Sequence, residues 1–176
     1  MRGPGQQALR PGGAGGTLIM ATLYETDFHA WAQDQAAKLL RLAAERSNSE
    51  LDLVHLAEEV ESMAGSDRRE LEVRLELVLV HLLKLAYCFY ASPRRQWVNS
   101  VQAQRGSIEK LLKQSPSLRR LMSDMLVTAY ATALEKARTE TAELTMDEPP
   151  ILCPFDLDTQ VLAKDFTPEP PVRYDA

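Results

Sequence analysis

The sequence lacks an apolar run long enough to cross a membrane. Its longest apolar stretches, 77–80 and 85–91, are interrupted by His81 and Lys84, and both fall short of the roughly 20 residues that a spanning helix needs. Only two cysteines occur, Cys88 and Cys153, and they form neither a metal-ligand spacing nor a disulfide framework. We therefore expect a soluble protein of the reducing cytoplasm, with Cys88 as a buried thiol and no cofactor or metal.

Glycine is scarce after residue 20, because six of the eight glycines lie before it. The apolar part of this glycine-rich segment is only Leu18, Ile19 and Met20, too short for a signal peptide. We interpret residues 1–20 as a disordered leader, or as an over-extended start with Met20 as the initiator. Residues 21–168 are expected to form one domain and 169–176 a disordered tail.

Leu, Ala and Glu are abundant and β-branched residues are few, which favours an all-α fold. Apolar residues at helical spacing predict a compact bundle of four to five long helices with a short C-terminal extended and helical tail. Gly65 is expected to end one helix, and the apolar stretch 77–90 to be buried on several sides. The predicted helices cover about 26–46, 50–64, 67–90, 95–114 and 115–143.

The predicted fourth helix carries a narrow seam with one polar position in it. Apolar residues and Gln104 alternate in steps of four and three, as in a bundle or a homodimer contact. The seam consists of Trp97, Val101, Gln104, Ile108 and Leu111. A buried amide needs partners, so we expect a polar inter-helix cluster, which is our candidate binding site. Its members are Glu61, Arg74, His81, Lys84, Gln104 and Arg105.

Charge is distributed unevenly, although the net charge is only −5. Residues 47–83 hold nine acidic and three basic side chains, residues 84–120 eight basic and one acidic, and residues 121–176 eleven acidic and four basic. We expect oppositely charged neighbouring helices to complement each other. The alternative is that region 94–120 binds an anionic partner such as nucleic acid. The residues for that role are Arg94, Arg95, Trp97, Arg105, Lys110, Lys113, Arg119 and Arg120.

Several of these residues also carry a resemblance to a known family. The chain contains LAEEVESM at 56–63, RREL at 68–71, HLLK at 81–84, Gln104-Arg105 and Cys153-Pro154. In this order they resemble the bacterial family called domain of unknown function twenty-nine, over about 23–168. Leu85 departs from the pattern, where an aromatic residue is expected. The resemblance implies a compact helical bundle and no known activity.

Three functions remain open. The first is a non-enzymatic interaction or regulatory module, because no phosphate loop, nucleophile elbow or dinucleotide fingerprint occurs in the sequence. The second is a metal-independent, HEPN-like ribonuclease using Arg74 and His81, which share one helical face. The third is the anionic-partner binder. A histidine in an apolar helix is more often structural, so we expect His81 to be buried and hydrogen-bonded.

Overall fold

The computed structural model describes residues 22–45, 50–89, 93–142 and 146–171. Within them lie α1 (Leu23–Thr26), α2 (Phe28–Ala44), α3 (Leu53–Tyr87), α4 (Arg94–Gln114), the 3-10 helix η1 (Pro116–Leu121), α5 (Met122–Glu140) and the π-helical turn η2 (Leu157–Val161). The described part of the chain contains no named strand, so the prediction of an all-α bundle is confirmed. The expected leader at 1–20 and residues 172–176 of the expected tail lie outside the described residues.

Helix α3 is the central element, and it is longer than the sequence suggested. It runs through Gly65 without a break for 35 residues, so the expectation that Gly65 ends a helix is wrong. Gly65 does not have the positive φ of a C-terminal glycine cap. The glycine costs an interior helix position only about 1 kcal/mol, and packing on both sides of it outweighs that cost.

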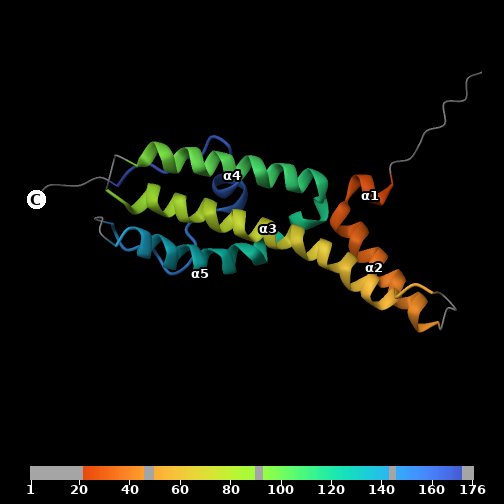
Figure 1. The fold of residues 1–176 in the computed structure, drawn as a ribbon. Coiled ribbons are helices and arrows are strands. Elements are labelled where there is room, and N and C mark those ends of the chain that lie inside the picture. Colours follow the sequence, from red (N-terminus) through yellow and green to blue (C-terminus); the bar gives the residue numbers. More distant parts are fainter. Residues whose placement is uncertain (1–21, 46–49, 90–92, 143–145, 172–176) are drawn as a thin grey trace, which may run out of the picture.

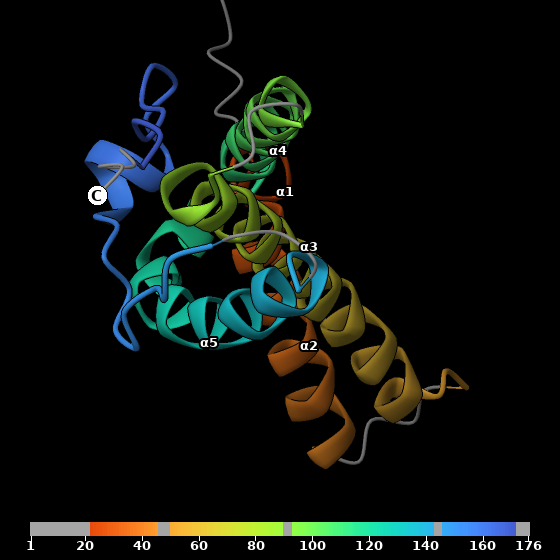
Figure 2. The ribbon, with the colours of Figure 1, turned by 90° about the vertical axis from the view of Figure 1, so that its left-hand side faces the viewer.

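Two parts of the molecule share α3. Its second half lies between α4 and α5 and forms the body of the protein, whereas its first part pairs with α2 in a hairpin that projects from one end (Figure 1). Figure 2 shows the same division from the side. The main hydrophobic core belongs to the body, beginning at Leu71 and including α4, α5 and Phe155 and Val161 of the C-terminal segment.

The predicted seam of α4 is part of this core. Val101 and Ile108 are almost fully buried, and Trp97 and Leu111 are buried as well. They pack within the same chain, because α4 lies along α3. This seam is therefore not available for the homodimer contact that its spacing suggested.

The hairpin has an interface of a different kind. Its buried residues are mostly alanines, with Ala32 and Ala36 from α2 and Ala57 and Ala64 from α3. Leu53, at the start of α3, is the one large apolar side chain that is buried among the described residues from 28 to 64. Small side chains let the two helices approach closely, but they bury little apolar surface.

Candidate functional site

Arg74 and Gln104, from the predicted polar cluster, meet between α3 and α4. Arg74 Nη1 donates to Gln104 Oε1 at 2.9 Å, and Arg74 Nη2 lies 2.7 Å from Glu70 Oε1. A surface groove of about 350 Å³ runs over this contact and is also lined by Ser66 and Arg69. This hydrogen bond gives the side-chain oxygen of Gln104 a partner and joins the two helices at the edge of the seam.

The other members of the predicted cluster lie elsewhere. Lys84 is buried, forms an ion pair with Glu140 of α5, and its Nζ lies 5.8 Å from the ring centroid of Trp97. Glu61 is exposed on the hairpin, in a depression lined also by Leu40. The six residues do not surround one common cavity, so the cluster as a whole is not a single site.

His81 is half-buried, and its environment differs from the expected one. Its Nδ1 atom is buried and has no hydrogen-bond partner among the described residues, so the expected hydrogen bond at this nitrogen is missing. Burial lowers the pKa of His81, and the nearby charge of Lys84 lowers it further. The imidazole is therefore held in its neutral form at neutral pH.

Arg105 has a structural role that the sequence did not reveal. The side chain is buried and donates to three carbonyl groups of the C-terminal segment: Nε to Val161 O at 2.8 Å, Nη1 to Phe166 O at 2.9 Å and Nη2 to Gln160 O at 2.6 Å. Burial lowers the pKa of this guanidinium. Arg105 thus fixes the C-terminal segment against α4.

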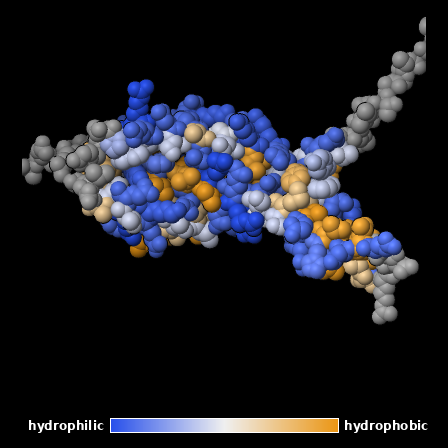
Figure 3. Space-filling model, in the orientation of Figure 1, coloured by the Kyte–Doolittle hydropathy of each residue, from blue (hydrophilic) through white to orange (hydrophobic). Residues whose placement is uncertain are grey.

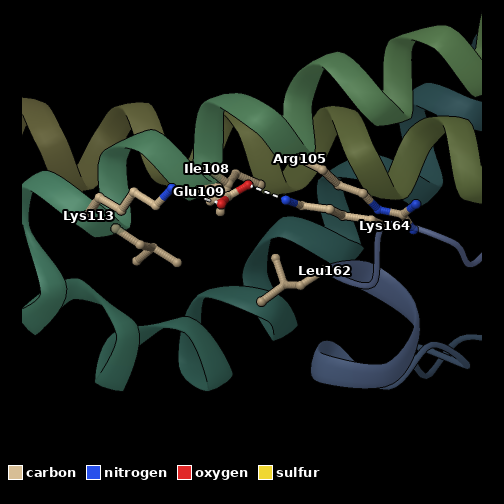
Figure 4. Close-up of a pocket in the computed structure, with 7 residues that line it drawn as sticks. Arg105, Ile108, Glu109, Lys113, Leu162 and Lys164 are labelled. Atoms are coloured by element: carbon tan, nitrogen blue, oxygen red, sulfur yellow. Dashed lines mark ion pairs between the residues drawn. The ribbon is translucent and has the colours of Figure 1, made fainter.

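A pocket of about 280 Å³ lies beside Arg105, with Ile108, Leu112 and Leu162 supplying its apolar lining (Figure 4). Its rim is closed by Glu109, whose carboxylate lies 3.0 Å from Lys113 Nζ and 2.7 Å from Lys164 Nζ. The two ammonium groups lower the pKa of Glu109 to about 2. Two lysines therefore share one carboxylate, so Glu109, Lys113 and Lys164 together keep one positive charge in excess.

Half of the residues in the predicted basic region are used inside the molecule. Trp97 and Arg105 are buried. Arg94 donates to the carbonyls of Leu85 and Pro168, and Arg119 pairs with Asp158. Arg95, Lys110, Lys113 and Arg120 are exposed. The geometry therefore supports charge complementarity between segments of the chain more than a surface for an anionic partner.

A polar network fixes the base of the hairpin to the body, and sequence reasoning missed it. His29 is buried; its Nδ1 lies 3.0 Å from Ala64 O, and its backbone N–H donates to Ser115 Oγ. Ser115 is fully buried and donates to Asp67 Oδ2 at 2.8 Å. Asp27, the N-cap of α2, also accepts from Ser117 of η1. This network joins α2, α3 and the α4–η1 junction.

Large apolar side chains are exposed on both sides of the hairpin, with Leu40 and Val54, each 46% exposed, on one side and a larger group on the other. We call this second surface the hairpin face and define it by Trp31 and Leu42 of α2 and Leu56 and Met63 of α3. Leu42, Leu56 and Met63 are 41%, 42% and 46% exposed, and Trp31 is partly exposed. At about 100° per residue, all four point to the same side, roughly a right angle from the alanine interface. Figure 3 shows hydrophobic residues gathered over the hairpin.

Aromatic rings lie at the base of the hairpin face. Tyr24 of α1 meets Trp31 edge-on, with ring centroids 4.8 Å apart, and Phe28 stacks on Trp31 at 5.6 Å. Such contacts restrain the Trp31 ring on the outside of the hairpin. The hairpin face is therefore a preformed apolar surface.

Metal ligands do not gather in the described part of the chain, where no group of three or more His, Cys, Asp or Glu side chains could hold an ion. Among the same residues, no helix combines the length and the apolar character that a membrane crossing requires.

The fold and these surfaces define an all-α bundle with a projecting helical hairpin. The family model described as Domain of unknown function DUF29 matches residues 23–167, and the chain belongs to this family. The chain is also similar to the crystal structure of an alpha-helical protein of unknown function from Rhodospirillum rubrum ATCC 11170. The two share 25% identity and a TM-score of 0.68, over 84% of this chain and 93% of that one. No curated protein matches the chain.

Proposed function

We propose that this protein is a non-enzymatic interaction module and that the hairpin face is its docking surface for another protein. The observation that carries the proposal is the distribution of side chains in the hairpin. Alanines fill its interior, whereas Leu42, Leu56 and Met63 lie outside in contact with solvent. Single exposed apolar residues are ordinary on protein surfaces, but a group of them on one projecting element is typical of an interaction site.

The other candidate functions have less support. Arg74, which the ribonuclease hypothesis assigns to phosphate binding, is already engaged by Glu70 and Gln104. The neutral His81 lies about two helical turns away from it. The anionic-partner hypothesis has less support because Arg94, Arg105 and Arg119 already bind the C-terminal segment of the chain. A cytoplasmic location is part of our proposal and is supported by the two unpaired cysteines.

Site-specific photo-crosslinking in the native host tests the docking surface. A photoreactive amino acid at Met63 is expected to give a discrete covalent adduct, because this side chain is 46% exposed on the hairpin face. The matched control is Val127, which is 71% exposed on α5, an element outside the hairpin. Equal adducts at both positions, or none at Met63, would contradict the proposed function.

A further inference from the structure

The hairpin face belongs to a pair of helices that is incomplete by itself. Two antiparallel helices that touch through Ala32, Ala36, Ala57 and Ala64 bury little apolar surface between them. In a four-helix bundle, each helix also buries a second flank against a neighbouring pair. Trp31 and Leu42 occupy that flank on α2, and the corresponding flank of α3 carries Leu56 and Met63. The hairpin thus has the side-chain arrangement of one half of a four-helix bundle.

The charges at the two edges of the hairpin face are opposite. Helix α2 carries Lys38 and Arg41 against a single acid, Asp34, which pairs with Lys38 at 2.6 Å and leaves one positive charge in excess on this edge. The part of α3 within the hairpin carries Glu58, Glu59 and Glu61 without Lys or Arg. In helical projection, Lys38 and Glu59 lie just outside the apolar residues of the hairpin face, on opposite edges. A surface with one basic and one acidic edge is complementary to its own twofold image.

The size of the hairpin face also suits a second copy. A helix of 17 residues is about 25 Å long, and two packed helices are about 20 Å wide. Because side chains project from the helices, the accessible area of the hairpin face is larger than a flat rectangle of this length and width. It is therefore of the order of the roughly 800 Å² that each partner buries in a stable complex.

We propose that two copies of this chain associate through the hairpin face and form a four-helix bundle, with α2 of each copy against α3 of the other. The inference rests on the proposed function and names its partner. The contact is isologous: Leu56 and Met63 of one copy meet the apolar residues of its twin, and Lys38 lies opposite the twin's Glu59 edge. The base of each hairpin stays fixed to its own body through His29 and Ser115.

Sedimentation equilibrium of the full chain at several concentrations tests the inference. The expected mass is twice the 19.7 kDa of one chain. Leu56→Glu and Met63→Glu should each raise the dimer dissociation constant by at least about 100-fold, because each residue is used twice across the twofold axis. Both side chains are half exposed in the single chain, so the variants should keep the wild-type circular dichroism. Val127→Glu is the control and should leave the mass unchanged.

Exchanging the charges at Lys38 and Glu59 distinguishes this dimer from dimers that form through other surfaces. Lys38→Glu and Glu59→Lys should each weaken the dimer, and the double variant should recover part of the loss, because the two edges face each other. A wild-type chain that stays monomeric, or a dimer insensitive to Leu56→Glu and Met63→Glu, would overturn the inference. If the chain is monomeric but still gives an adduct of another mass at Met63, the proposed function stands and only the second copy is wrong. Without either dimer or adduct, both fail.

Discussion

Three polar side chains of α3, Arg74, His81 and Lys84, lie within about three turns of one helix and yet have different environments. Arg74 reaches the surface and bonds to Gln104. Lys84 is buried and has both a carboxylate, Glu140, and an aromatic ring as partners. His81 has a buried nitrogen without a partner. A cation with two favourable contacts stabilises the fold, whereas the unpartnered nitrogen of His81 reduces its stability.

His81 should therefore be replaceable by an apolar residue of similar size. We expect His81→Leu to be at least as stable as the wild type at pH 7, because it removes the unpartnered Nδ1 and keeps the volume. His81→Ala should lose about 1–3 kcal/mol, because it leaves a cavity beside α3. Denaturant unfolding of both variants measures these differences. A large loss in His81→Leu would show that the imidazole makes a required polar contact.

The same substitution has a pH dependence with a definite sign. The pKa of His81 is lowered in the folded state from its ordinary value of 6.5, so the unfolded chain takes up the proton first as the pH falls. The wild type should lose stability relative to His81→Leu as the pH falls below about 6.5, until the folded-state pKa is reached. The comparison cancels the opposite effect of His55, whose pKa is raised by Asp52. An unchanged difference between pH 7 and pH 5 would contradict this assignment.

Whether the surroundings of a polar side chain could be predicted from the sequence depends on which groups are its hydrogen-bond partners. The spacing of Trp97, Val101, Gln104 and Ile108 was enough to predict a buried seam with a polar contact. The partners of Arg105 are backbone carbonyls about 55 residues further along the chain, and a carbonyl leaves no signature in the sequence. The burial of Ser115 could be suspected only from its place before Pro116. Its bond to Asp67 depends on the angle at which the hairpin leaves the body.

At the scale of elements, the continuity of α3 decides the shape of the molecule. The first part of α3 belongs to the hairpin and its second half to the body. Residues 64–71, which connect the two parts, therefore fix the orientation of the hairpin relative to the body. Periodicity predicted helices on both sides of Gly65, and the glycine suggested a break between them. The tertiary contacts of Ala64 and Leu71, both buried, favour a continuous helix over the local preference of glycine.

Substitution of Gly65 distinguishes a continuous helix from a broken one. We expect Gly65→Ala to stabilise the protein by about 0.5–1 kcal/mol, because alanine loses less conformational entropy in a helix. The added Cβ would meet only the end of the flexible Arg69 side chain, at 3.0 Å. Gly106→Ala in α4 is the matched control, since a Cβ there has nothing within 4 Å. If thermal melting shows a gain for Gly106→Ala but a loss for Gly65→Ala, the helix breaks at Gly65.

At the scale of the whole molecule, the charge blocks of the sequence correspond to contacts between segments. The basic region 94–120 receives the C-terminal segment through Arg94, Arg105 and Arg119, and Lys136 of α5 pairs with Glu76 of α3. The hairpin takes little part in this arrangement, because it contacts the body mainly at its base. Ion pairs, hydrogen bonds and core packing thus hold the segments of the body together, whereas the hairpin face remains exposed.

Arg105 is the residue on which the attachment of the C-terminal segment should depend most. We expect Arg105→Lys to destabilise the fold by about 2–4 kcal/mol. Lysine keeps the charge, but its single nitrogen cannot reach three carbonyls in the geometry of the guanidinium, and a buried ammonium without a carboxylate is costly. Residues 156–168 should also lose protection in hydrogen exchange and become sensitive to proteases.

Lys110→Ala, at an exposed position of the same helix, is the control and should change neither quantity. If Arg105→Lys lowers stability while residues 156–168 stay protected, Arg105 acts through the packing of α4. The C-terminal segment would then be held by Phe155 and Val161, which are buried in the core.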